Sequence, residues 1–315
     1  MNDRDVRKRF FALMEKKNPS YISRFFLDLL QEEPPRFVIV QKLLEEAEEG
    51  FTYEVLDLMC KSCLQANRFP LARQIVELSE NEEDRALLLF LIAEDTHKTR
   101  DIDAVRNACT DIDENVAAHT REKLYRLTGF ASDLQELLRA LDHCTDPDLK
   151  MDIFCDLLAT TVPKLNIIFA AIAAADHDSY GTMDDEEFIR KLLEHIVKAV
   201  IARADTDLEI LLKAINRCEN IDLKTNLLCD LLAEMPRAEI ILAAFTAADK
   251  NDQATAEGKE RADMLVDCAV DALEQECNEN LIVRVAQEVA SPVIQEKFFE
   301  AAIALWHGSK TFGTN

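Results

Sequence analysis

Residues 176–187 carry oxygen-bearing groups at a spacing that suits a calcium ion. Ca²⁺ takes six to eight oxygen ligands, and a twelve-residue loop supplies them from positions one, three, five, seven, nine and twelve. Five of these positions are filled by Asp176, Asp178, the Thr182 carbonyl, Asp184 and Glu187. Gly181 stands at position six, where the chain must turn sharply, whereas Tyr180 at position five is not a ligand type. The loop therefore predicts a calcium site that lacks one ligand.

This loop resembles the calcium loop of EF-hand proteins, and the resemblance implies a calcium-binding or regulatory function. Its counterpart, 249–260, has Ala254 at the glycine position, and the two loops begin 73 residues apart instead of pairing as neighbours. The alternative is that both are long, acid-rich junctions between structural repeats, in which acids cap the following helix. Calcium is the only cofactor that the sequence suggests.

A second group of candidate residues forms a column of acids. Matching positions in four successive helices, together with positions one turn earlier, hold Asp152, Asp156, Glu194, Asn226, Asp230, Asp263 and Asp267. A spacing of four residues places two side chains on one helix face. Such a face would attract a basic or amphipathic peptide. The alternative is an ordinary solvated face of an acidic protein.

Other catalytic or metal-binding chemistry is not indicated. Cys60 and Cys63 form a lone CxxC without the second half of a zinc site, so we expect them to pack within a helix. The sequence contains no GxSxG, HExxH, P-loop or glycine-rich dinucleotide motif. We therefore predict that the protein is not an enzyme.

The composition limits the partners and the location. The 315 residues include 36 Lys+Arg and 60 Asp+Glu, a formal charge of −24, which disfavours nucleic acid. Nine scattered cysteines, no secretory leader and no apolar run of spanning length predict a cytoplasmic protein without a membrane span. Met1–Phe25 is locally basic, with seven basic and three acidic residues. It predicts an amphipathic helix that caps the fold, or alternatively makes peripheral membrane contact.

Internal repeats are the main signal for the fold. The segment 138–144 matches 212–218, and Cys155-Asp156-Leu157-Leu158-Ala159 matches Cys229-Asp230-Leu231-Leu232-Ala233. Polar junctions, which we expect to cap helices, recur at 79–82, 110–113, 145–148, 219–222 and 291–294. With two longer junctions at 176–187 and 249–260, their mean spacing is about 35 residues, typical of a stacked helix–turn–helix unit.

Arg85-Ala86-Leu87, followed by Ile92-Ala93, resembles the tetratricopeptide-like repeat family, over roughly residues 51–306. The family's Trp and helix-breaking Gly are missing from the unit, and armadillo-like or HEAT-like arrays remain alternatives. The resemblance implies an all-α, right-handed superhelical solenoid of about seven helix–turn–helix repeats, whose first helices line a concave groove. We predict a helical cap at 1–50, the solenoid at 51–307 and a polar tail at 308–315. The predicted function is a protein-interaction scaffold.

Overall fold

The computed structural model describes residues 3–47, 49–160, 163–177, 183–251, 256–276 and 279–311. Within these ranges, the side chains of 49–50, 177, 183–189, 251, 256, 274–276, 279 and 305–311 are not described. All regular elements in these ranges are α-helices and none is a strand, so the predicted all-α helical repeat is confirmed. None of the helices described is long and apolar enough to cross a bilayer.

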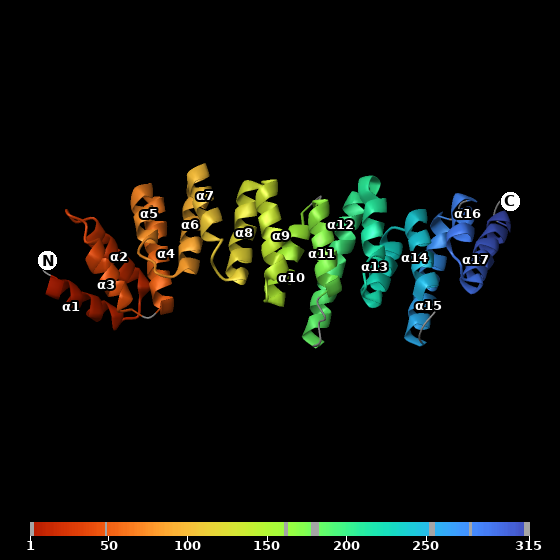
Figure 1. Cartoon of the computed structure of the whole chain (residues 1–315), viewed down its shortest axis with the longest axis horizontal. Coiled ribbons are helices and arrows are strands. Elements are labelled where there is room, and N and C mark those ends of the chain that lie inside the picture. Colours follow the sequence, from red (N-terminus) through yellow and green to blue (C-terminus); the bar gives the residue numbers. More distant parts are fainter. Residues whose placement is uncertain are drawn as a thin grey trace. The chain divides into compact units, whose positions relative to one another are not determined.

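The chain forms two compact units, Met1–Lys150 and Met151–Asn315, which we call the N-terminal and the C-terminal unit. The N-terminal unit contains α1 (Asp3–Met14), α2 (Pro19–Leu30), α3 (Phe37–Glu45), α4 (Glu49–Gln65), α5 (Phe69–Val76), α6 (Glu82–Thr96), α7 (Thr99–Ala108), α8 (Glu114–Thr128) and α9 (Ala131–His143) (Figure 1). The division falls inside α10 (Pro147–Leu158). The sequence analysis did not predict a division at this point.

Three helix pairs, which we call modules, stack in the N-terminal unit: α4–α5, α6–α7 and α8–α9. The first helices α4, α6 and α8 each contact the next, and each also packs against its own second helix. One apolar cluster runs from Val6 and Phe10 of α1 through Phe26 of α2 to Leu56 and Ile92. The apolar stripe of the basic N-terminal helix therefore packs on this core.

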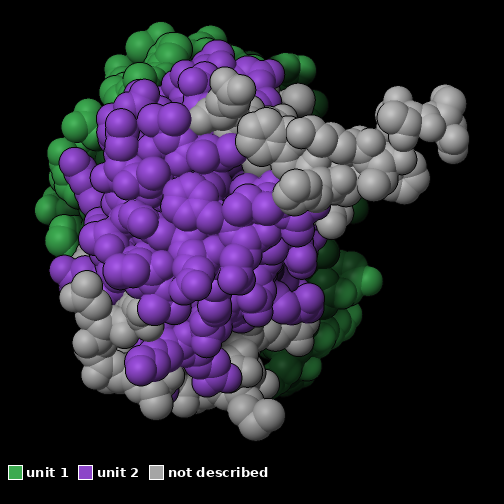
Figure 2. All heavy atoms as spheres, turned by 90° about the vertical axis from the view of Figure 1, so that its right-hand side faces the viewer, with its two compact units in different colours: residues 1–150 green, residues 151–315 purple. Residues whose placement is uncertain are grey.

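The C-terminal unit repeats the same arrangement. It contains α11 (Leu165–His177), α12 (Met183–Asn216), α13 (Ile221–Glu234), α14 (Ala238–Asn251), α15 (Ala256–Glu276), α16 (Glu279–Glu288) and α17 (Pro292–Thr311). The first helices α13, α15 and α17 follow one another in contact, and the second helices α14 and α16 do the same. Figure 2 shows this unit in purple, viewed from the side where α16 and α17 lie in Figure 1.

Local sequence explains where the helices begin. Asn81, Asp113, Asp146 and Asn220 lie in the predicted junctions, and each side chain accepts a hydrogen bond from a backbone N–H of the following helix. Such a cap satisfies an N–H group that has no partner within its helix, and is worth about 1 kcal/mol. Within the modules, a residue with a left-handed backbone follows the end of each first helix: Asn67, His97 and Gly129, whose φ angles are 57°, 50° and 66°.

One module has no turn between its helices. α12 runs for 34 residues and spans both the first and the second helix of the fifth repeat. The stretch Ala202-Arg203-Ala204-Asp205 stands where a turn is expected, and it contains neither Gly nor Asn, the residues that most readily adopt a left-handed backbone. Arg203 and Asp207 form an ion pair four residues apart at 2.7 Å, which supports a continuous helix.

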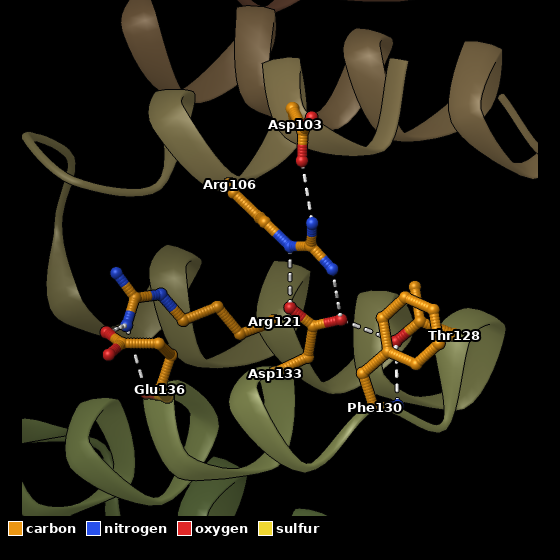
Figure 3. Close-up of polar contacts among 7 residues, drawn as sticks. All are labelled: Asp103, Arg106, Arg121, Thr128, Phe130, Asp133 and Glu136. Atoms are coloured by element: carbon orange, nitrogen blue, oxygen red, sulfur yellow. Dashed lines mark hydrogen bonds and ion pairs between the residues drawn. The ribbon is translucent and has the colours of Figure 1, made fainter. Parts of the chain in front are cut away.

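Buried acids connect the second helices of the N-terminal unit (Figure 3). Asp133 of α9 is 4% exposed and accepts two hydrogen bonds from Arg106 of α7, at 2.7 and 2.9 Å, and one from Thr128 at 2.5 Å. Arg73 of α5 and Thr96 make the same contacts with Asp101 of α7, at 2.7–2.8 Å. A buried carboxylate is tolerated only when it is paired in this way.

The cysteines of the lone CxxC pack within α4, as the sequence predicts. Cys60 and Cys63 are buried, and burial raises the pKa of the Cys60 thiol to about 12. The described cysteines are free of disulfide bonds.

Replacing Asp133 with Ala should lower the free energy of unfolding by about 2–3 kcal/mol, because the half-buried Arg106 and Thr128 lose their buried acceptor. The matched control is Asp103→Ala, which removes an exposed partner of the same arginine, 2.6 Å away, and should cost under about 1 kcal/mol. Chemical denaturation followed by circular dichroism measures both. Equal losses would contradict the importance of the buried pair.

The hydrogen bonds to Asp133 and Asp101 should also make the stability of the fold depend on pH. Burial alone would raise the pKa of Asp133, but hydrogen bonds from Arg106 and Thr128 outweigh it and lower the pKa; the hydrogen bond from Arg73 lowers that of Asp101. A lowered folded-state pKa stabilises the fold above the unfolded value, about 3.9, and this stabilisation is lost as pH falls below it. Melting temperature measured against pH should therefore fall less steeply in acid for Asp133→Asn than for the wild type.

Candidate functional site

The predicted acids all lie on the surface of first helices. Asp152 and Asp156 belong to α10, Glu194 to the N-terminal half of α12, Asn226 and Asp230 to α13, and Asp263 and Asp267 to α15; every one of these side chains is exposed. Contacts between α12 and α13 and between α13 and α15 place three of these helices in succession. The role of these acids in binding stays a prediction.

Basic neighbours partly neutralise this acidic row. Glu194 pairs with Lys198 at 2.6 Å, and this hydrogen bond lowers the pKa of Glu194. Asp263 of α15 pairs with Lys297 of α17, also at 2.6 Å. Asp230 differs, because partial burial and the nearby charge of Glu234 raise its pKa. A carboxylate that is held near another acid gains most from an incoming cation.

One groove lies on the second helices, and none of the predicted acids lines it. It measures about 700 Å³ and runs between the C-terminal half of α12, α14 and α16. We call it the second-helix groove; its lining is Ala204, Asp205, Thr206, Leu208, Glu209, Leu212, Lys213, Asn216, Arg237, Glu239, Leu242, Ala243, Thr246, Arg284 and Glu288. Three successive repeats thus contribute to one hollow.

The groove has an apolar floor and a charged rim. Leu208, Leu212, Leu242 and Ala243 form the floor, each 4–7% exposed. Ion pairs occupy the rim, at 2.7 Å for Lys213–Glu209, 2.6 Å for Arg237–Asp205 and 3.2 Å for Arg284–Glu288. The hydrogen bond from Lys213 lowers the pKa of Glu209, and the charge of Arg284 on the facing helix adds to this shift. An apolar floor with alternating charges around it suits a protein segment better than a small anion or cation.

A second hollow continues the groove. It measures about 490 Å³ and is lined by α11 and the C-terminal half of α12, including Phe169 and Ile210. Lys213 lines both hollows, so they are neighbours. Ile210 is 50% exposed, so it presents apolar surface beside this hollow. The two hollows together therefore run across four second-helix segments: α11, the C-terminal half of α12, α14 and α16.

A smaller groove of the N-terminal unit lies instead on first helices. It measures about 440 Å³ and is bounded by Tyr53 of α4, Phe90 of α6 and Lys123 of α8, whose ammonium lies 5.9 Å from the centre of the Phe90 ring. Here first helices line a groove, as the sequence analysis expected of the array.

Asp176, the first residue of the calcium-like loop, has a structural partner. Its carboxylate accepts hydrogen bonds from the backbone N–H groups of Glu219 and Asn220, at 3.0 and 2.8 Å. Asp249, its counterpart in the repeat, does the same for Ala290 and Ser291, at 2.9 and 2.7 Å. Each aspartate at the end of a second helix thus holds the start of a later module. The matching pair in the sequence could have revealed this role.

The rest of the predicted calcium ligands lie outside the described part of the chain. Asp178 and Thr182 are not described, and neither are the side chains of Asp184 and Glu187. Among the described side chains, no cluster of three or more His, Cys, Asp or Glu residues could hold a metal ion. Calcium binding stays a prediction.

Comparisons with known proteins identify no family. No protein-family model matches the sequence, and no curated protein matches it. One similar solved structure is described as a "circular tandem repeat protein with novel repeat topology and enhanced subunit contact surfaces"; the two chains are 14% identical over 99% of this chain and 72% of that one, with a TM-score of 0.19. Another comes from "computational design of self-assembling cyclic protein homooligomers", at 15% identity over 98% and 96%, with a TM-score of 0.13. Likeness at these TM-scores carries no argument about function.

Replacing Asp176 with Ala should lower the free energy of unfolding by about 1.5–3 kcal/mol, because two backbone N–H groups lose a charged acceptor. The loss should be equal in calcium chloride and in chelator. Glu257→Ala, an exposed acid in the first turn of α15, is the control. Thermal melts of the variants and the wild type check this. A calcium-dependent rise in the wild-type melting temperature that Asp176→Ala abolishes would support the calcium site instead.

Proposed function

We propose that this protein is a non-enzymatic scaffold for protein–protein interaction, and that its C-terminal unit binds a peptide or helical segment of a partner in the second-helix groove. The observation that carries the proposal is the groove itself, because three repeats build it and its floor is apolar. Stacked helical repeats offer extended surfaces of this kind to protein partners.

The partner segment is expected to be basic or amphipathic. Residues 151–315 contain 30 acidic and 15 basic residues, a net charge of −15, against 30 and 21, or −9, in residues 1–150. The rim of the groove is itself nearly balanced, so apolar side chains of the segment would supply the contact energy. The acids of the first helices, with Asp230 foremost, would raise the association rate of a basic segment and repel nucleic acid.

We also propose that the protein belongs to the tetratricopeptide-like class of repeat and acts in the cytoplasm. The polar caps Asn81, Asp113 and Asp146 are 32 and 33 residues apart, which is close to the 34-residue tetratricopeptide repeat. This spacing supports a tetratricopeptide-like array. Nine cysteines without a pattern typical of disulfide scaffolds support the cytoplasm as the place where it acts.

The test starts from peptides selected from a random displayed library against the full-length protein. Thr246 lines the groove and is partly exposed, so Thr246→Arg should fill the hollow and raise the dissociation constant of the selected peptides at least about tenfold. Fluorescence anisotropy with the synthetic peptides measures this change.

The matched control is Ala202→Arg, which adds the same side chain to an exposed position of α12 outside the groove. It should leave the affinity unchanged, and both variants should melt like the wild type. If Asp230→Asn/Asp267→Asn weakens binding and Thr246→Arg does not, the first-helix acids are the binding site and the groove is not. A library that yields no binding peptide would overturn the proposal.

A further inference from the structure

The first and last helices of the chain carry outward faces of opposite charge. In α1, Val6 and Phe10 are buried at 0–1% exposure, and Arg4, Lys8 and Phe11 lie along the opposite side of the helix. We call these three residues the basic end face. Arg4 and Lys8 form no ion pair with the described residues, whereas the adjacent Arg7 is paired with Glu46. Phe11 is 49% exposed.

The last helix, α17, shows the complementary pattern. Ile294, Phe298 and Ala302 point into the core, and the opposite stripe, which we call the acidic end face, consists of Val293, Glu296, Glu300 and Ile303. Val293 is 58% exposed and Ile303 53% exposed. The glutamates have no ion-pair partner among the described residues, since the neighbouring Lys297 pairs with Asp263 of α15.

Both faces differ from ordinary array ends. The outer surface of a terminal repeat is normally polar, because no further repeat covers it. Here α1 exposes one large apolar side chain, Phe11, beside Arg4 and Lys8, and α17 exposes two, Val293 and Ile303, beside Glu296 and Glu300. Apolar contact together with opposite charge is the combination that joins two protein surfaces in a fixed orientation.

We propose that a second copy of this chain covers these faces, with α1 of one molecule packed on α17 of the next. Such a contact joins two different surfaces, so it can propagate into open chains or close into rings. α1 has 12 residues, which is about 18 Å of helix, so the interface is smaller than that of a standard stable complex. We therefore expect weak association that rises with protein concentration and falls with salt. The inference does not depend on the second-helix groove.

Sedimentation velocity of the full-length protein over a concentration series, at low and high salt, tests the proposal. The wild type should show a sedimentation coefficient that increases with concentration at low salt. Arg4→Glu/Lys8→Glu has two acidic ends, and Glu296→Lys/Glu300→Lys has two basic ends. Each variant alone should remain monomeric, with a dissociation constant raised at least about tenfold.

An equimolar mixture of the two variants should associate again, because every acidic end then meets a basic one. The controls are Lys42→Glu on α3 and Asp271→Lys on α15, exposed residues outside both faces, which should behave like the wild type. Unchanged thermal melts show that the variants are folded. A monomeric wild type at all concentrations, association that survives both double variants, or a mixture that stays monomeric would each overturn the proposal. Binding of monomeric wild type to phosphatidylserine vesicles, lost in Arg4→Glu/Lys8→Glu, would assign the basic end face to a membrane instead.

Discussion

The stacking of this protein depends on buried or half-buried carboxylates that reach from one module to another. Asp101 and Asp133 pair with arginines of the preceding second helix, and Asp176 and Asp249 hold the backbone N–H groups that open a later module. Apolar contacts between helices are weakly directional, so they allow neighbouring pairs to slide or rotate. A buried charge does not allow this, because any displacement leaves it without a partner in a region of low dielectric constant. The acids therefore fix the register in which the apolar surfaces meet.

The two units meet this need in different ways. In the N-terminal unit the link joins two side chains, and a threonine near the end of the first helix completes it, as Thr128 does for Asp133. The C-terminal unit uses one side chain and the backbone, so only the aspartate needs a particular identity. The two segments that are most alike in sequence, 138–176 and 212–249, each end in such an aspartate. These buried and half-buried aspartates also show that the acidity of the chain is not only a surface property.

Sequence alone was sufficient for features that neighbouring residues determine. Helix caps at the junctions and the burial of Cys60 and Cys63 follow from local chemistry, and the observed caps and packing agree with them. The uninterrupted helix α12 was harder to predict from the sequence, because the absence of a turn residue is a weaker signal than the presence of one. The residues that line the second-helix groove could not be predicted from the sequence either. Which helix layer encloses a hollow depends on small rotations between modules, and these accumulate from packing contacts far apart in the sequence.

The position of the groove and the charges of the end faces have a common physical origin. Within each unit, stacking uses the sides of the modules. The faces that run along the stacked helices stay open, and so do the outward sides of α1 in the N-terminal unit and of α17 in the C-terminal unit. Along the array, side chains such as Lys213 and Glu209 neutralise each other within one helix, so the apolar floor beside them can stay open to water without a strong field. On α1 and α17 the unpaired charges of each face have one sign, and internal neutralisation is not available to them. In the proposed contact, an acidic face on α17 and a basic one on α1 would each repel a like face, which favours contact between unlike ends.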